Sequence, residues 1–310
     1  MEAAKKGFIP VMLSPFTDQG AIDFPALAAL TEYYLEAGAA GLFANCLSSE
    51  MFELTEAERL EAIRLVVKVA NGRVPVVATG TFGGTLETQA GFVRQVADCG
   101  VQAVIGITGL LAGAEESEAV FAERAFRLLD LTPGVPFGFY ECPVPYKRLI
   151  SPELLGQLVA TGRVVYHKDT CLDIRQVREK LRLAGKPGFG LYDAYMVHAV
   201  ESLRAGSAGL SCIQGNFFPE LVVWLCDHYD REDLQEEVNR VQAFFTDHME
   251  VMHTVYPLVA KYFLQQRGLG ITTFTRRDVG VFSPEVKRNI EALSRHYGQL
   301  QEALGLQVAL

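Results

Sequence analysis

The chain has 310 residues, of which 49% are hydrophobic and 21% are charged, and its formal net charge is −9 at pH 7. This composition is ordinary for a soluble globular protein. The negative charge argues against a nucleic-acid partner and against binding to an anionic membrane surface, although one local site can still be positive enough for a small anionic ligand.

Neither the start of the chain nor its cysteines indicate export or a membrane anchor. Residues 1–7 lead into a strand-like run without the long apolar stretch of a signal peptide, and no apolar stretch is long enough to span a bilayer. None of the six cysteines belongs to a C-x-x-C pair, which disfavours zinc-ribbon and thioredoxin-like sites. We therefore expect a cytoplasmic protein with reduced thiols.

Short apolar runs alternate with amphipathic helical stretches over the first two thirds of the chain. We expect eight strands, at residues 8–13, 41–45, 75–79, 103–107, 137–141, 164–168, 189–192 and 209–213. Strands that alternate with helices predict a parallel sheet, and eight such units predict an α/β fold of the (β/α)8 TIM-barrel type.

Helix starts are marked by capping signals. Thr55 is followed three residues later by Glu58, the pattern of a capping box. Ser151 and Ser283 are each followed by a proline and a glutamate, which suits an N-cap and the first helical turn. These signals support helices between and after the predicted strands.

The strand signals stop near residue 225. Residues 231–266 and 283–303 show helical spacing instead, and the first of these stretches is rich in aromatic residues. We therefore predict a barrel domain over 1–225 and a C-terminal helical extension over 226–310. Its apolar surface should pack on the outer helices of the barrel or on another subunit.

Lys168 is the most informative single residue. It ends a short, mostly apolar run that is typical of a buried strand, where a lysine is rarely found without a partner. Burial removes water from the amine and favours its neutral form, which attacks carbonyl groups to give a Schiff base. The alternative is a structural ion pair between Lys168 and Asp169 or another carboxylate.

Two further strand ends carry reactive side chains. Tyr140 ends the fifth predicted strand, and residues 45–50 follow the second. In a barrel the active site forms at the carboxyl ends of the strands, and neighbouring strands lie about 4.8 Å apart. A phenol at 140 and an amine at 168 could then reach a common substrate, although a tyrosine that only packs inside the barrel fits the sequence too.

The hydroxyl and N–H groups of Ser48 and Ser49, in the loop after the second strand, could bind the carboxylate of a ligand.

Together these motifs resemble the dihydrodipicolinate synthase / N-acetylneuraminate lyase family of class I pyruvate-dependent aldolases. The similarity covers about residues 7–300. Cys46 to Glu50 stand in place of the family's Gly-Thr-Thr-Gly-Glu loop, Tyr140 to Pro143 resemble its Tyr-Asn-x-Pro motif, and Lys168 to Thr170 resemble Lys-Asp-Ser/Thr. Tyr140 and Lys168 are 28 positions apart, as the family's tyrosine and lysine are.

The resemblance implies a role for each matching residue. Lys168 would form the Schiff base, and Tyr140 would move protons and touch the substrate carboxylate. Ser48 would be the hydroxyl linked to that tyrosine, and Ser49 would add an N–H or hydroxyl to the carboxylate. Two more residues are expected to bind the rest of the substrate: Thr170 and Asp193, the latter in a Tyr-Asp pair similar to that of the lyases.

Several positions depart from the synthase pattern. Glu141 stands where the family has asparagine, Leu47 replaces a hydroxyl residue, and Pro145 replaces an arginine. Residues 108–111 lack the tyrosine pair of the synthases. These departures favour an aldolase or a dehydratase that acts on a 2-keto acid, in particular a 2-keto-3-deoxy sugar acid, and releases or uses pyruvate.

Other functions stay open at this point. Dihydrodipicolinate synthase activity proper, a non-catalytic relative that binds keto acids, and a metal-dependent aldolase on the same fold are the alternatives. The resemblance implies no metal and no organic cofactor, and it implies a homotetramer built as a dimer of dimers. The sequence does not separate carbon–carbon cleavage from dehydration.

Overall fold

A computed structural model describes residues 6–306 of the chain, so residues 1–5 and 307–310 of the predicted barrel and extension lie outside the described residues. Eight parallel strands form one sheet in the order β1-β8-β7-β6-β5-β4-β3-β2. The strands are β1 (Gly7–Phe8), β2 (Leu42–Ala44), β3 (Val76–Thr79), β4 (Ala103–Ile107), β5 (Phe137–Tyr140), β6 (Val164–Asp169), β7 (Gly190–Asp193) and β8 (Gly209–Leu210).

The two ends of this sheet meet and close the barrel. A parallel bridge joins Val11 to Phe43, the Phe43 N–H donates to the Pro10 carbonyl (3.0 Å), and the Met12 N–H donates to the Phe43 carbonyl (3.1 Å). The predicted strand over residues 8–13 is shorter in the structure, because Pro10 has no N–H for a regular ladder. The predicted (β/α)8 barrel is confirmed.

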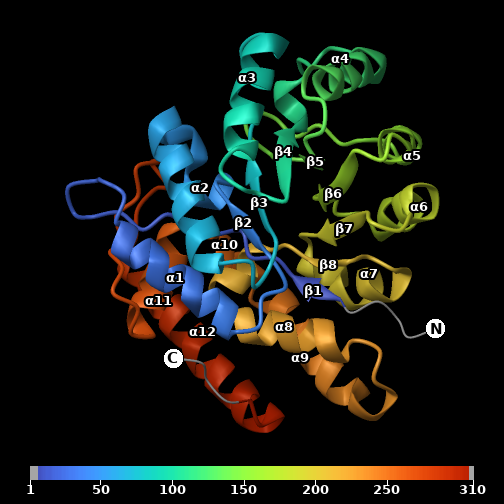
Figure 1. Ribbon diagram of the computed structural model, residues 1–310. Helices are drawn as coiled ribbons and strands as arrows, with labels where there is room; N and C mark the ends of the chain where they lie inside the picture. The colour runs from blue at the N-terminus through green and yellow to red at the C-terminus, as the bar shows by residue number, and fades with distance from the viewer. Residues whose placement is uncertain (1–5, 307–310) are drawn as a thin grey trace.

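Helices follow the strands and surround them as a ring (Figure 1). They are α1 (Phe24–Glu36), α2 (Glu56–Ala70), α3 (Leu86–Ala97), α4 (Glu118–Leu131), α5 (Pro152–Ala160), α6 (Ile174–Ala184), α7 (Ala199–Ala205) and α8 (Pro219–His228). The predicted caps are present: Thr55 and Glu58 form a reciprocal capping box, and the Ser151 and Ser283 hydroxyls accept backbone N–H bonds.

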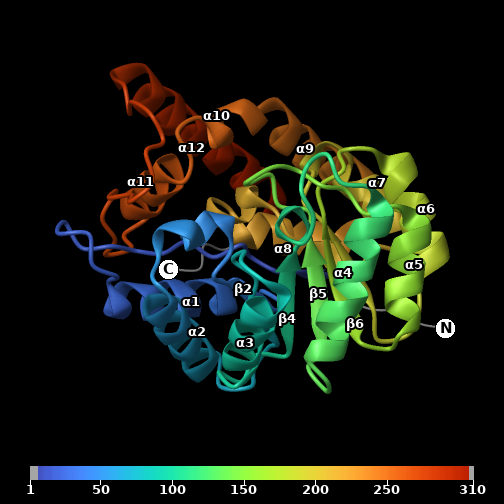
Figure 2. The same cartoon turned by 90° about the horizontal axis from the view of Figure 1, so that it is seen from above.

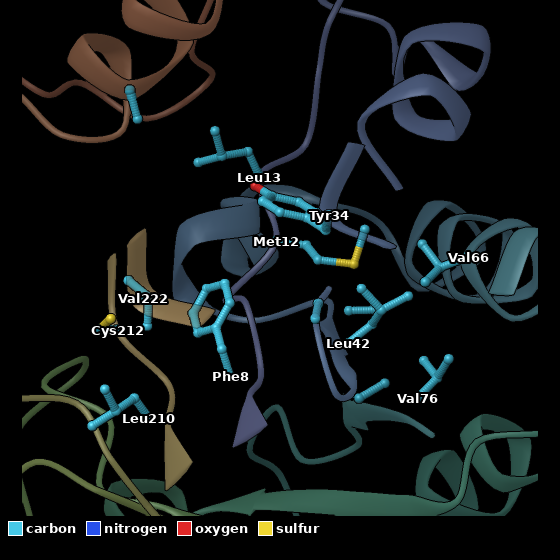
Figure 3. Packing of buried hydrophobic residues seen from close by; sticks show 14 of the residues in the cluster. Phe8, Met12, Leu13, Tyr34, Leu42, Val66, Val76, Leu210, Cys212 and Val222 are labelled. Carbon is cyan, nitrogen blue, oxygen red and sulfur yellow. The ribbon is translucent and has the colours of Figure 1, made fainter. Parts of the chain in front are cut away.

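Apolar side chains form two layers of core. The larger layer lies between the strands and the helices and includes Phe8, Tyr34 and Val222 (Figure 3). The smaller one fills the interior of the barrel around Phe43, and Tyr140 is part of it. Because side chains alternate along a strand, inward residues reach the interior and their neighbours reach the helices.

The C-terminal helices lie over the carboxyl end of the barrel. They are α9 (Gln235–Asp247), α10 (Met249–His253), α11 (Leu258–Gln266) and α12 (Pro284–Leu304). Helix α9 packs against the turn after β7, and α10 packs against the turn after β8, so the two cross the top of the barrel (Figure 2). The predicted boundary at residue 225 falls inside α8, and the division into two domains stays a prediction.

Among the described residues, no helix combines the length and apolarity that crossing a membrane requires.

A buried ion cluster fixes the ends of β5 and β6 from the outside of the barrel. Lys180 on α6 donates to Glu141 Oε1 and to Asp169 Oδ2, each at 2.6 Å, and all three side chains are fully buried. The second oxygen of Glu141 accepts the Thr170 N–H (3.0 Å), while Oε1 also accepts the Ile150 N–H (2.9 Å). Glu141 occupies the position at which the family motif has asparagine, and Lys180 neutralises its charge.

His167 completes this cluster. Its Nε2 lies 3.5 Å from Glu141 Oε1 and 3.7 Å from Asp169 Oδ2, and within residues 6–306 neither ring nitrogen has a hydrogen-bond partner. Burial alone would lower the pKa of His167, but the two carboxylates raise it above its usual value. Among the described residues, Glu141, His167 and Asp169 are the one set with metal-ligand geometry, but they face the helices and the Lys180 ammonium already lies between the carboxylates.

We predict that Lys180→Met destabilises the fold by about 3–5 kcal/mol at neutral pH, since it leaves two buried carboxylates without their cation. Urea unfolding would measure the loss. Exposed Lys68 on α2 provides the matched control, because Lys68→Met should change the free energy of unfolding by less than about 0.5 kcal/mol. A Lys180→Met protein as stable as the control would contradict the role given to the cluster.

Candidate active site

Lys168 and Tyr140 lie side by side and point into the barrel. They are register partners on the adjacent strands β6 and β5. The Lys168 Nζ sits 4.3 Å from the centroid of the Tyr140 ring and 5.9 Å from that of Phe43. The neighbours of Lys168 along the strand, His167 and Asp169, face the helices, as the alternation of side chains predicts.

The Lys168 amine is buried without a counter-ion. Its side chain is 4% exposed, and among the described residues no carboxylate forms an ion pair with it. Asp169, the partner in the structural alternative, bonds to Lys180 instead. Burial lowers the pKa of Lys168, since the surrounding groups offset only part of the lost hydration. The arrangement favours a neutral, nucleophilic amine.

Tyr140 remains a protonated phenol at neutral pH. Burial is the main cause that raises the pKa of Tyr140 well above its usual value, and the nearby thiols of Cys142 and Cys46 add to it. Its ring packs edge-on against Phe43, with centroids 5.9 Å apart. A phenol held in this way next to an amine can pass a proton without ionising for long.

The two predicted serines in the loop after β2 make different contacts. Ser48 lines the cavity that holds Lys168, and its Oγ accepts a hydrogen bond from the Tyr256 hydroxyl (2.7 Å). The Ser49 hydroxyl donates to the Met12 carbonyl (2.6 Å) and accepts the Cys46 N–H (3.0 Å), and the Ser49 N–H donates to the Cys46 carbonyl. The predicted contact of Ser49 with a carboxylate therefore requires one of these bonds to break.

Of the other two predicted binding residues, Thr170 lies at the cavity and Asp193 lies outside its described lining. Thr170 lines the cavity, although its hydroxyl donates to the Glu141 carbonyl (2.6 Å). Asp193 is buried, accepts the Tyr195 N–H and pairs with His198 Nε2, both at 2.9 Å. It is outside the set of described residues that line the cavity. Its contact with a substrate stays a prediction, and in this structure it orients the loop after β7.

The cavity has a volume of about 690 Å³ and opens at the carboxyl end of the barrel. This size suits a small organic molecule. Sequence analysis missed much of its wall. The missed polar side chains come from the ends of β5, β7 and β8 and from the C-terminal helices: Lys147, Tyr195, Ser211, Gln214, Thr246, Asp247, Glu250, His253, Tyr256 and Arg277.

The C-terminal contribution could not be found from the sequence. Helical spacing predicted α9 and α11, but it does not tell which turn between helices faces the barrel. Only the helical crossing over the barrel brings Tyr256 next to Ser48 and Arg277 to the wall of the same cavity. The one available signal was the excess of aromatic residues, which we assigned to packing.

Comparisons with known proteins point to one family. The family model described as "Dihydrodipicolinate synthetase family" matches residues 4–296. The 4-hydroxy-tetrahydrodipicolinate synthase of Jannaschia sp. (strain CCS1) is 26% identical over 295 residues, which are 95% of this chain and 99% of that protein. The enzyme of the same name from Saccharophagus degradans is 26% identical over 85% of this chain and 89% of its own length.

Solved structures share the fold. YagE, a prophage protein of the dihydrodipicolinic acid synthase family from E. coli K12 in complex with pyruvate, superposes with a TM-score of 0.82 at 21% identity, over 96% of this chain and 98% of that chain. A monomeric dihydrodipicolinate synthase variant gives a TM-score of 0.86 at 19% identity, over 96% of this chain and 98% of that chain. Since the family model matches nearly the whole sequence, the chain belongs to the dihydrodipicolinate synthetase family.

Proposed function

We propose that this protein is a class I lyase that forms a Schiff base between Lys168 and a 2-keto acid. The observation that carries the proposal is the buried amine of Lys168, which faces the cavity, has no counter-ion and packs on the Tyr140 ring. A buried amine of this kind is a nucleophile at neutral pH. Membership in the family supports the same chemistry, and the pyruvate complex of YagE supports the class of ligand.

In this mechanism the neutral Lys168 amine attacks the keto carbon, and loss of water gives an iminium ion. The iminium then accepts the electron pair of the bond that breaks next. Tyr140 moves the proton while a carbon–carbon bond breaks to release pyruvate, or while water leaves from the neighbouring carbon. These steps use no metal or organic cofactor.

A 2-keto-3-deoxy sugar acid suits the wall of the cavity. Beyond Lys168 the wall presents Thr170, Ser211 and Gln214, which can bond to hydroxyl groups. The Gln214 side chain is buried, and its Oε1 accepts no hydrogen bond from the described residues. A buried acceptor without a donor is costly, so a substrate hydroxyl that donates to it would be bound favourably.

Borohydride trapping tests the proposal. Incubation with pyruvate and borohydride should add one reduced pyruvate unit to Lys168, and peptide mass spectrometry would locate it. Lys168→Ala should abolish the adduct, and Lys147, the other lysine of the cavity wall, serves as the internal control because it should stay unmodified. An unmodified Lys168 at saturating pyruvate would overturn the proposal.

The pH dependence of trapping should reflect the lowered pKa of Lys168. The neutral fraction of an amine rises with pH and levels off above its pKa, so the trapping rate should reach its plateau below the usual lysine value of 10.5. Rates measured between roughly pH 6 and pH 10 would show this. A rate that still climbs about tenfold per pH unit between roughly pH 8 and pH 9 would indicate an ordinary amine.

Gln214→Leu should separate binding of the substrate tail from Schiff-base formation. We expect kcat/KM for a 2-keto-3-deoxy sugar acid to fall about tenfold, since a hydrogen bond worth about 1.4 kcal/mol is lost. Pyruvate trapping should be unchanged, because pyruvate has no hydroxylated tail. Equal kcat/KM values for the variant and the parent protein would remove Gln214 from the binding site.

Synthase activity proper is the second candidate, because the curated relatives named above are 4-hydroxy-tetrahydrodipicolinate synthases. Against it stand Pro145 in place of an arginine and the absence of a tyrosine pair at residues 108–111. An assay for 4-hydroxy-tetrahydrodipicolinate would decide between the two. Turnover that is lost in Lys168→Ala would exclude a non-catalytic relative, and activity that survives chelation would exclude a metal-dependent aldolase.

The assembly and location belong to the proposal as well. A homotetramer, built as a dimer of dimers in the cytoplasm, follows from the resemblance to the family. Sedimentation of a monomer at micromolar concentration would count against the tetramer. Within each subunit we propose that the barrel of residues 1–225 carries the reacting groups and that the extension of residues 226–310 closes the cavity.

A further inference from the structure

Tyr256 brings a second phenol to the cavity from outside the barrel. It lies in the connection between α10 and α11, which crosses the carboxyl end of the barrel (Figure 2). Its side chain lines the same cavity as Lys168, Tyr140 and Ser48. The C-terminal extension therefore places a titratable group beside the reacting ones, in addition to covering them.

A directed chain of hydrogen bonds holds this phenol. Tyr34 donates to Asn216 Oδ1 (2.6 Å), and Asn216 Nδ2 donates to the Val11 carbonyl (2.9 Å) and to the Tyr256 oxygen (2.5 Å). The Tyr256 hydroxyl then donates to Ser48 Oγ (2.7 Å). Because both ends of the Asn216 amide are occupied, its orientation is fixed, so Tyr256 cannot donate to Asn216 and donates to Ser48 instead.

The backbone is strained on both sides of this contact. Val255, next to Tyr256, has φ 47°, and Asn45 and Glu50 on either side of the serine loop have φ 53° and 55°. A left-handed conformation is unfavourable for most residues other than glycine and persists where the surroundings enforce it, often at functional sites. For a β-branched valine it is a clear outlier. Strain at both partners indicates that the Tyr256–Ser48 contact is specifically built.

We propose that Tyr256 and Ser48 form a proton relay to the bound keto acid, with Tyr256 supplied by the C-terminal extension of the same chain. This inference rests on the proposed Schiff-base function. Tyr256 acts through Ser48, since its hydroxyl proton is directed at the Ser48 oxygen. Among the described residues, Ser48 Oγ makes no other hydrogen bond, so its own proton can go to the ligand, directly or through Tyr140.

The proton count balances along the chain. In the direction of the hydrogen bonds, Tyr256 gives its proton to Ser48, Ser48 gives its own proton to the ligand, and the Asn216 N–H stabilises the negative charge that develops on the Tyr256 oxygen. Enamine formation returns this proton: Ser48 takes a C3 proton of the iminium and passes its own proton to the Tyr256 oxygen, while the C3–H electron pair forms the C2–C3 double bond and the C2–N π pair returns to nitrogen.

The protonation states suit a relay. Burial raises the pKa of Tyr256 far above its usual value, although the bonds to Ser48 and Asn216 lower it in part. Tyr140 and Tyr256 line the same cavity. Since neither phenol is ionised at neutral pH, a proton that either phenol gives away must return to it within the reaction cycle.

Hydrogen–deuterium exchange at C3 of pyruvate measures the relay without the natural substrate. In D2O, the full-length protein should exchange the methyl protons of pyruvate, as followed by NMR. Tyr256→Phe should slow this exchange by roughly 10²-fold, the usual contribution of a positioned proton-transfer group. Borohydride trapping of pyruvate on Lys168 should change less than about twofold, because the amine and its surroundings are unaltered.

Two further variants make the test selective. Ser48→Ala should show the same loss, and the double variant should lose no more than the worse single variant, as expected for residues that act as a unit. Tyr262→Phe is the matched control, because it removes a hydroxyl that bonds to Glu291 on α12 (3.1 Å) and is not among the described residues that line the cavity. Its exchange rate should equal that of the parent protein.

The outcomes separate the relay from the proposed function. Exchange at the parental rate in Tyr256→Phe, or losses that multiply in the double variant, would overturn the relay and leave the lyase intact. Equal loss of exchange and trapping in Tyr256→Phe would also overturn it, because the tyrosine would then only support the fold. Absence of trapping in the parent protein would overturn both.

Discussion

The chemistry proposed for this protein depends on one buried amine, which has no counter-ion among the described residues. Lys168 lies beside Asp169 at the end of β6, and two such neighbours could neutralise each other on a flexible chain. In the barrel they point to opposite faces, and Lys180 bonds to Asp169 and Glu141 from the helix side. This division keeps Asp169 and Glu141 away from the cavity, so desolvation of Lys168 is only partly offset and favours its neutral form.

A second buried ion pair ties the serine loop to the C-terminal segment. Glu50 accepts a bond from Lys261 Nζ (2.7 Å) on α11, and its other oxygen accepts the N–H groups of Arg276 (2.6 Å) and Arg277 (2.9 Å). The residue after Ser49 thus anchors both the extension and a cationic side chain of the cavity wall. Movement of either segment would break these bonds, so the extension and the catalytic loop form one unit.

Much of the site could be predicted because it lies on strands and their immediate ends. Alternation of side chains placed Tyr140 and Lys168 inward and left His167 outward, as found. Ser49 and Asp193 show the limit of motif matching, since position along the chain does not reveal which hydrogen bonds a side chain already makes. Their matching positions in the family do not decide whether they reach the substrate.

The sequence by itself determined the barrel and the order of its elements, because local periodicity and strand alternation act over a few residues, and its resemblance to the family pointed to Tyr140 and Lys168 as the pair proposed to react. Only the tertiary structure decided that Lys180 neutralises Glu141 and that Tyr256 meets Ser48, 208 positions away. Contacts of this separation depend on how helices cross the barrel. That geometry follows from the packing of the whole core and leaves no local pattern in the chain.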